Sequence, residues 1–254
     1  MNTKLILLAC ACLCTAAGHS QQAVPSPVTD YKASLFGIRS DGITMNTNSI
    51  QKAIDYIGEQ GGGRLCFYVG RYRTGSIRLK SNVTLRLEEG AGLIASASPY
   101  DYDFLNGTAA LIIADGQEHV AITGKGFIEG EGALLSGRID EQTARGNLPK
   151  SRESFRPAVI YMNRCTDIRL DGILSNNAAG DVQVYERCTG LEVNGVTVIS
   201  RLNPKTRGIV LDGCVGVHLT GMYIDTPAKE IALKGAVSGD VKVRESKNAA
   251  GKAL

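Results

Sequence analysis

The sequence predicts an all-β protein, a right-handed parallel β-helix solenoid with an amphipathic capping helix near its N-terminus. Three observations support this prediction: a repeat of about 24 residues, a high glycine content and a single helix-like segment. Glycine accounts for 30 of the 254 residues, about 12% against a typical ~7%, as expected for a chain with many tight turns. Short strands joined by glycine turns at a fixed period are typical of stacked coils.

The repeat is clearest in three segments where a short alternating strand ends in Cys165, Cys188 or Cys214. An aliphatic residue follows three positions after each cysteine, and the four successive anchors, including a weaker last copy, are Ile168, Leu191, Val217 and Val241. An earlier copy near Val120 lies two periods before the first anchor. We expect equivalent residues to stack at about 4.8 Å. The three cysteines should then form an inward ladder of free, packed thiols. Leucine-rich repeats are disfavoured because their asparagine-centred signature is missing.

The helix is expected over residues 48–58, where Ile50, Ala53, Ile54 and Ile57 form one apolar stripe. Thr47 or Asn48 is the expected helix cap, and the glycines at 61–63 end the segment. Because a solenoid has raw ends, we expect this helix to cover the N-terminal end of the core. The charged, aperiodic segment Ala133 to Arg156 is expected to be a surface loop.

Residues 1–20 are typical of a secretory signal peptide, with Lys4, an apolar run of about ten residues and a small-residue exit. Export is therefore expected, and lipoprotein anchoring through Cys10 is the less favoured alternative because only five apolar residues precede it. Residues 31–254 are expected to form one β-helix domain, and one hypothesis considered below is that C-terminal coils are missing from it.

Composition and spacing exclude several classes of partner. The net charge of +3 gives no bulk electrostatic case for nucleic acid, and the apolar run is too short for a membrane span. No C-x-x-C pair suggests zinc, and acidic residues do not cluster as calcium requires. We expect no metal, no cofactor and a monomer.

Two long stretches, "LFGIRSDGITMNTNSIQKAIDYI" and "GGGRLCFYVGRYRTGSIRLKSNVTLRLEEGAGLIAS", resemble family 28 glycoside hydrolases, the polygalacturonases and rhamnogalacturonases. The segments "ITGKGFIEGEG" and "RPAVIYMNRCTDIRLDGI" continue the resemblance, which runs from about Phe36 to Lys234. It implies the pectin-lyase-type β-helix, pectin-type polymers as substrate and hydrolysis that inverts the anomeric centre.

The resemblance also shows which residues the family would use for catalysis. Its Asn-Thr-Asp-Gly motif corresponds to Lys205–Gly208 here, so that Arg207 stands in place of the aspartate. Its Asp-Asp pair corresponds to Ala228 and Lys229 in "IDTPAKEIALKG". The later Gly-His-Gly and Arg-Ile-Lys motifs are not found before Leu254. All three carboxylates of the family are therefore replaced.

The replacements leave a basic patch of Lys205, Arg207 and Lys229, suited to binding uronate carboxylates. The weak catalytic candidates that remain are Asp212, Asp225 and Glu230. Three hypotheses follow for this exported carbohydrate-active protein. It is a hydrolase with a rearranged site, a non-catalytic binder of acidic pectic oligosaccharides, or a truncated and decayed copy of such an enzyme. A calcium-dependent pectate-lyase mechanism is a weaker fourth.

Overall fold

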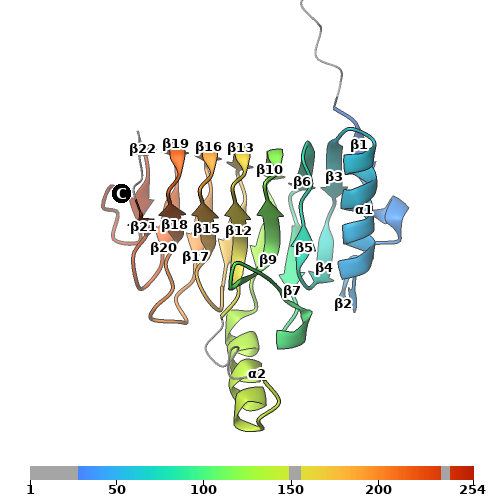
Figure 1. Cartoon of the computed structure of the whole chain (residues 1–254), viewed down its shortest axis with the longest axis horizontal. Coiled ribbons are helices and arrows are strands. Elements are labelled where there is room, and N and C mark those ends of the chain that lie inside the picture. The colour runs from blue at the N-terminus through green and yellow to red at the C-terminus, as the bar shows by residue number, and fades with distance from the viewer. Residues whose placement is uncertain (1–27, 149–155, 236–240) are drawn as a thin grey trace, which may run out of the picture.

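The computed structural model describes residues 28–148, 156–235 and 241–254, which form three parallel sheets stacked coil upon coil (Figure 1). Within each regular coil the chain passes from sheet C through sheet A to sheet B. The predicted signal peptide lies outside the described residues. Among those residues, no helix is long and apolar enough to cross a membrane.

The strands of each sheet follow one another in the stack, so the sheets run the length of the molecule. Sheet A contains β1 (Asp30–Lys32), β3 (Gly63–Phe67), β6 (Val83–Leu87), β10 (Glu118–Gly124), β13 (Thr166–Asp171), β16 (Thr189–Asn194), β19 (Val215–Thr220) and β22 (Val241–Arg244). Sheet B contains β2 (Asp41–Met45), β4 (Gly70–Thr74), β7 (Ala91–Ala95), β11 (Phe127–Glu129), β14 (Leu174–Asn176), β17 (Thr197–Ile199), β20 (Tyr223–Asp225) and β23 (Lys247–Asn248). Sheet C contains β5 (Ile77–Arg78), β9 (Thr108–Asp115), β12 (Ala158–Asn163), β15 (Gln183–Glu186), β18 (Ile209–Asp212) and β21 (Ile231–Lys234), with β8 (Asp103–Leu105) antiparallel to β9.

The residues that repeat in the sequence pair with one another in the register of sheet A. The predicted anchors pair in succession along the stack, in the order Val120, Ile168, Leu191, Val217 and Val241. The first four are completely buried in one continuous apolar core. The predicted coil period is thus confirmed, because each copy supplies one rung of the core.

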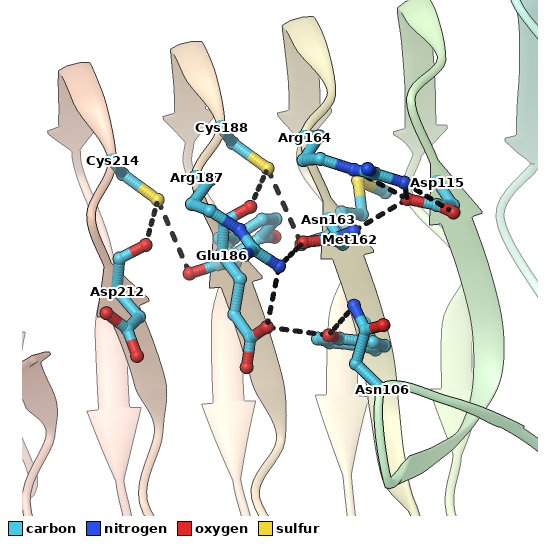
Figure 2. Close-up of polar contacts among 12 residues, drawn as sticks. Asn106, Asp115, Met162, Asn163, Arg164, Glu186, Arg187, Cys188, Asp212 and Cys214 are labelled. Carbon is cyan, nitrogen blue, oxygen red and sulfur yellow. Dashed lines mark hydrogen bonds and ion pairs between the residues drawn. The ribbon is translucent and has the colours of Figure 1, made fainter.

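The cysteine ladder is also confirmed. Cys165, Cys188 and Cys214 are free and buried, one at each successive turn from sheet C to sheet A. Figure 2 shows Cys188 and Cys214 at equivalent positions of neighbouring coils. Each thiol contacts a backbone carbonyl; the Sγ of Cys188, for example, lies 3.4 Å from the oxygen of Met162 on the preceding coil. These thiols therefore pack as small core residues.

The turn from sheet C to sheet A, here called the corner, uses a left-handed residue on each coil. Gly116, Gly213 and Gly235 fill it on three coils, whereas Arg164 and Arg187 fill it on the two coils between, at φ of 52° and 51°. Both arginines reach back one coil, Arg164 to Asp115 and Arg187 to Asn163 (Figure 2). The corner thus repeats both a backbone conformation and a side-chain contact.

The predicted helix is α1 (Thr47–Glu59), and all four residues of its apolar stripe are completely buried. It packs on β3, β5 and β6, at the end of the stack where the chain begins (Figure 1). The predicted cap is wrong, because the N-cap residue is Asn46, whose side chain bonds Arg39 instead of the helix. Thr47 is also engaged elsewhere, since its hydroxyl accepts the backbone N–H of Gly75 at 2.7 Å.

The expectation of a loop after Ala133 is wrong over its first half, which forms the helix α2 (Gly132–Ala144). Only Leu135 and Ile139 supply buried side chains of appreciable size, so the sequence shows little apolar periodicity. Glu141 pairs with arginines one turn away on either side, which supports an exposed helix. In Figure 1, α2 projects from the stack below sheet C. The described residues also form two short 3-10 helices, η1 (Ala33–Phe36) and η2 (Pro99–Asp101).

Candidate functional site

A cavity of about 820 Å³ lies over the segments that precede the last strands of sheet C and extends along β21. It is called the groove here, and its charged lining residues are Arg156, Asp181, Lys205, Arg207, Lys229 and Lys234. Most of them precede a strand of sheet C, so successive coils bring them together from segments far apart in the sequence. Five cationic side chains and one carboxylate therefore face the same space.

The structure brings the three predicted substrate-binding residues, Lys205, Arg207 and Lys229, into this one cavity. Backbone hydrogen bonds hold their segments side by side. The N–H of Gly208 donates to the carbonyl of Lys229 at 3.0 Å, and the N–H of Ala228 donates to the carbonyl of Thr206 at 3.2 Å. The basic patch is thus part of the stacked frame.

Arg207 is held by Asp181, a groove residue that sequence reasoning missed. Its Nε and Nη2 donate to the two carboxylate oxygens at 2.9 and 2.5 Å, and its backbone N–H donates to Oδ1 at 3.0 Å. The hydrogen bond from Asp181 raises the pKa of Arg207 above its ordinary value. Asp181 lies 26 residues before Arg207, and the pairing of Gln183 with Ile209 places both at equivalent points of adjacent coils. The signal in the sequence that could have identified Asp181 is its negative charge one coil period before the positive charge of Arg207.

The ion pair with Asp181 occupies one edge of the Arg207 guanidinium and leaves a second edge without a hydrogen bond from the described residues. Asp181 takes the Nε–Nη2 edge, while no hydrogen bond from the described residues reaches Nη1 of Arg207. A guanidinium can bind a second carboxylate in a bidentate manner through its Nη1–Nη2 edge. Arg207 therefore holds this second N–H edge in a fixed orientation, from which it can donate hydrogen bonds to an anion.

The lysines carry the uncompensated charge of the groove. Within the described parts of the chain, Lys205, Lys229 and Lys234 have no carboxylate within 4 Å, whereas Arg156 pairs with Asp140 of α2 at 2.6 Å. Lys234 was not among the predicted site residues, although it belongs to the quoted motif. Three ammonium groups thus line the cavity that contains the Arg207–Asp181 pair.

The three weak catalytic candidates do not line the groove and do not come together. Asp225 is buried on β20 and accepts from Nε of Arg201 at 2.7 Å. Glu230 accepts from Asn248 at 2.9 Å. Asp212 ends β18 at the corner (Figure 2), where it pairs in register with Lys234 of β21, and it is not among the lining residues of the groove.

The described lining residues of the groove are therefore suited to binding anions. Inverting hydrolysis needs a carboxylic acid and a carboxylate base roughly 6.5–9.5 Å apart. Asp181 is the one carboxylate among the described lining residues, and it accepts three hydrogen bonds from Arg207. Nor does any cluster of three histidine, cysteine, aspartate or glutamate residues in the described chain suit a metal ion.

Comparison with known proteins places the chain in a family. The profile of glycosyl hydrolases family 28 matches residues 70–252, and the chain therefore belongs to that family. A crystal structure from Parabacteroides merdae, provisionally assigned as a glycosyl hydrolase, is 40% identical with a TM-score of 0.80. The match covers 88% of this chain and 99% of that one.

Two further relatives are longer. A probable polygalacturonase of Vitis vinifera is 29% identical over 80% of this chain and 44% of its own length. The family 28 exopolygalacturonase of Yersinia enterocolitica is 21% identical, with a TM-score of 0.71 over 81% of this chain and 45% of that one. The chain spans less than half the length of the curated relatives it matches. The structural similarities confirm the predicted right-handed parallel β-helix.

Proposed function

We propose that the protein binds acidic, pectin-type oligosaccharides in the groove without hydrolysing them by the family's carboxylate mechanism. The observation that carries the proposal is that Arg207 and three lysines line one cavity, where no carboxylate of the described residues pairs with the lysines and Asp181 is the one carboxylate in the described lining. Uronate units supply carboxylates spaced along a chain, which suits several separate cationic donors.

Two features support binding over turnover. Arginine and lysine side chains are protonated at neutral pH, so they donate hydrogen bonds and cannot act as a general base. The candidate carboxylates Asp212, Asp225 and Glu230 lie outside the groove. The relatives named as polygalacturonases support the class of ligand, and the signal-like residues 1–20 support export to where such polymers occur.

The test measures binding and turnover separately. Oligogalacturonates of three to six units are titrated calorimetrically into the wild type, a Lys205→Ala/Lys229→Ala variant and a Lys52→Ala/Lys252→Ala control. The control removes the same charge from exposed lysines that do not line the groove. We expect the groove variant to bind about tenfold or more weakly, because two charge-assisted contacts are lost. The control should stay within about twofold, and added salt should weaken wild-type binding.

Release of reducing ends from polygalacturonate at pH 5 to 7 should be negligible in the same preparation. Turnover at rates comparable to active hydrolases would restore the hypothesis of a rearranged catalytic site, with Asp181 as the first residue to replace. A folded protein that binds no oligogalacturonate would favour the decayed-copy hypothesis.

A further inference from the structure

A second cavity of about 350 Å³ adjoins the groove and shares Arg156, Asn203 and Pro204 with it. It is called the neutral pocket here. Its other walls are the first turn of α2, through Gly132, Ala133 and Ser136, together with Ala178 and Leu202. None of these five residues carries a charge, so the electrostatic character changes where the two cavities meet.

The one charged residue of the neutral pocket is already compensated. Arg156 donates from Nη2 to Asp140 of α2 at 2.6 Å, and its side chain is three-quarters buried. A carboxylate entering the neutral pocket would lose water without meeting an uncompensated cation, which is unfavourable. An uncharged unit with apolar surface would instead cover Leu202, whose side chain is exposed.

The neutral pocket is built into the frame of the β-helix. The N–H of Gly132 donates to the carbonyl of Asn177 at 2.7 Å, so α2 begins directly on a coil. A side chain at Gly132 would place its Cβ 2.5 Å from the carbonyl oxygen of Ala178, so only glycine allows this approach. On the opposite wall, Asn203 donates to the carbonyl of Ala179 at 2.8 Å and fixes the loop that carries Leu202.

We infer that the groove and the neutral pocket together select an acidic oligosaccharide in which a free uronate unit neighbours an uncharged, methyl-esterified one. The free carboxylate lies among Lys205, Lys229 and Arg207, and the ester methyl lies against Leu202 and the first turn of α2. This inference rests on the proposed function. It adds a preference for a pattern of charge along the ligand.

The test compares ligands that differ only in esterification. Unesterified trigalacturonate and the three trigalacturonates that carry a single methyl ester are titrated into the wild type. We expect one ester isomer to bind about tenfold more tightly than the unesterified trimer, because it avoids stranding a carboxylate in the neutral pocket. Equal affinity for all four ligands would overturn the inference.

A pair of variants locates the preference. Leu202→Lys places an ammonium group in the neutral pocket and should remove most of the tenfold difference by strengthening the binding of the unesterified trimer. Leu134→Lys is the matched control, since Leu134 is 50% exposed against 57% for Leu202 but lines neither cavity. Equal effects of the two substitutions would also overturn the inference. Binding of all four trimers without preference leaves the proposed function intact, whereas binding of none removes both proposals.

Discussion

The two ends of the strands in sheet C are built on different rules. At the corner, successive coils repeat one left-handed residue, one buried cysteine and one contact to the coil before (Figure 2). At the groove, the same strands begin after loops of unequal length that carry Asp181, Arg207 and Lys229. The corner shows that repetition builds the core, whereas the groove shows that departures from repetition create a site.

The ion pairs at the two ends differ in burial. At the corner, the side chain of Arg164 is 61% exposed and that of its partner Asp115 is 30% exposed. At the groove, the corresponding values are 28% for Arg207 and 19% for Asp181. Since water screens exposed pairs, the corner pair should contribute little stability, and the groove pair should matter more.

The largest expected effect separates the repeated core from the groove surface. Leu191→Ala, at a completely buried rung, should lower the free energy of unfolding by about 2–5 kcal/mol through lost burial and a cavity. Leu202→Ala, on the exposed wall of the neutral pocket, should change it by less than about 0.5 kcal/mol. Urea unfolding followed by circular dichroism gives both values. Similar losses in the two variants would contradict the division between core and site.

The second prediction compares the two ion pairs. Asp181→Asn keeps the shape of the side chain but leaves the half-buried Arg207 without its counter-charge, and should cost about 1–2 kcal/mol. Asp115→Asn at the exposed corner pair should lower the free energy of unfolding by less than about 0.5 kcal/mol. In 1 M NaCl the effect of Asp115→Asn should vanish, because salt screens the exposed pair. Thermal unfolding at both salt concentrations measures the contrast, and the reverse ranking would contradict it.

The third prediction concerns the pH dependence of stability and Tyr161, a buried residue in the middle of β12. Burial, reinforced by its hydrogen bond to Glu186 at 2.7 Å, raises the pKa of Tyr161 to about 12. Because an unfolded tyrosine ionises near pH 10, the folded state holds this proton more tightly. The resulting stability is fully present below about pH 10 and is lost as the pH rises through about 12.

Tyr161→Phe removes that pH-dependent contribution and costs about 1 kcal/mol at neutral pH through the lost hydrogen bond. The decline in stability between pH 9 and 12 should therefore be shallower in the variant. Unfolding midpoints across this range provide the measurement, with Tyr100→Phe as an exposed control. Parallel curves for Tyr161→Phe and the wild type would show that another group governs the decline.

The same contrast explains what the sequence could predict. The anchors from Ile168 to Val217 and the cysteine ladder repeat at one period, so pattern alone placed them correctly. Lys205, Arg207 and Lys229 were grouped correctly only through the family motif. Asp181 was missed because its role depends on pairing with the next coil, and α2 was missed because two buried side chains give almost no helical periodicity.

The smallest expected effect tests whether the corner is strained. Arg187 occupies a left-handed conformation that glycine fills at the equivalent positions 116, 213 and 235. In this conformation a residue other than glycine destabilises the fold by about 1 kcal/mol. The hydrogen bond from Arg187 to Asn163 at 2.7 Å stabilises the fold by a similar amount. Arg187→Gly loses the bond and the strain together, so its stability should stay within about 0.5 kcal/mol of the wild type. Arg187→Ala loses the bond but keeps the strain, and should be about 1 kcal/mol less stable than Arg187→Gly. Chemical unfolding of the two variants isolates the backbone contribution, and an alanine variant as stable as the glycine variant would show that the corner stores no strain.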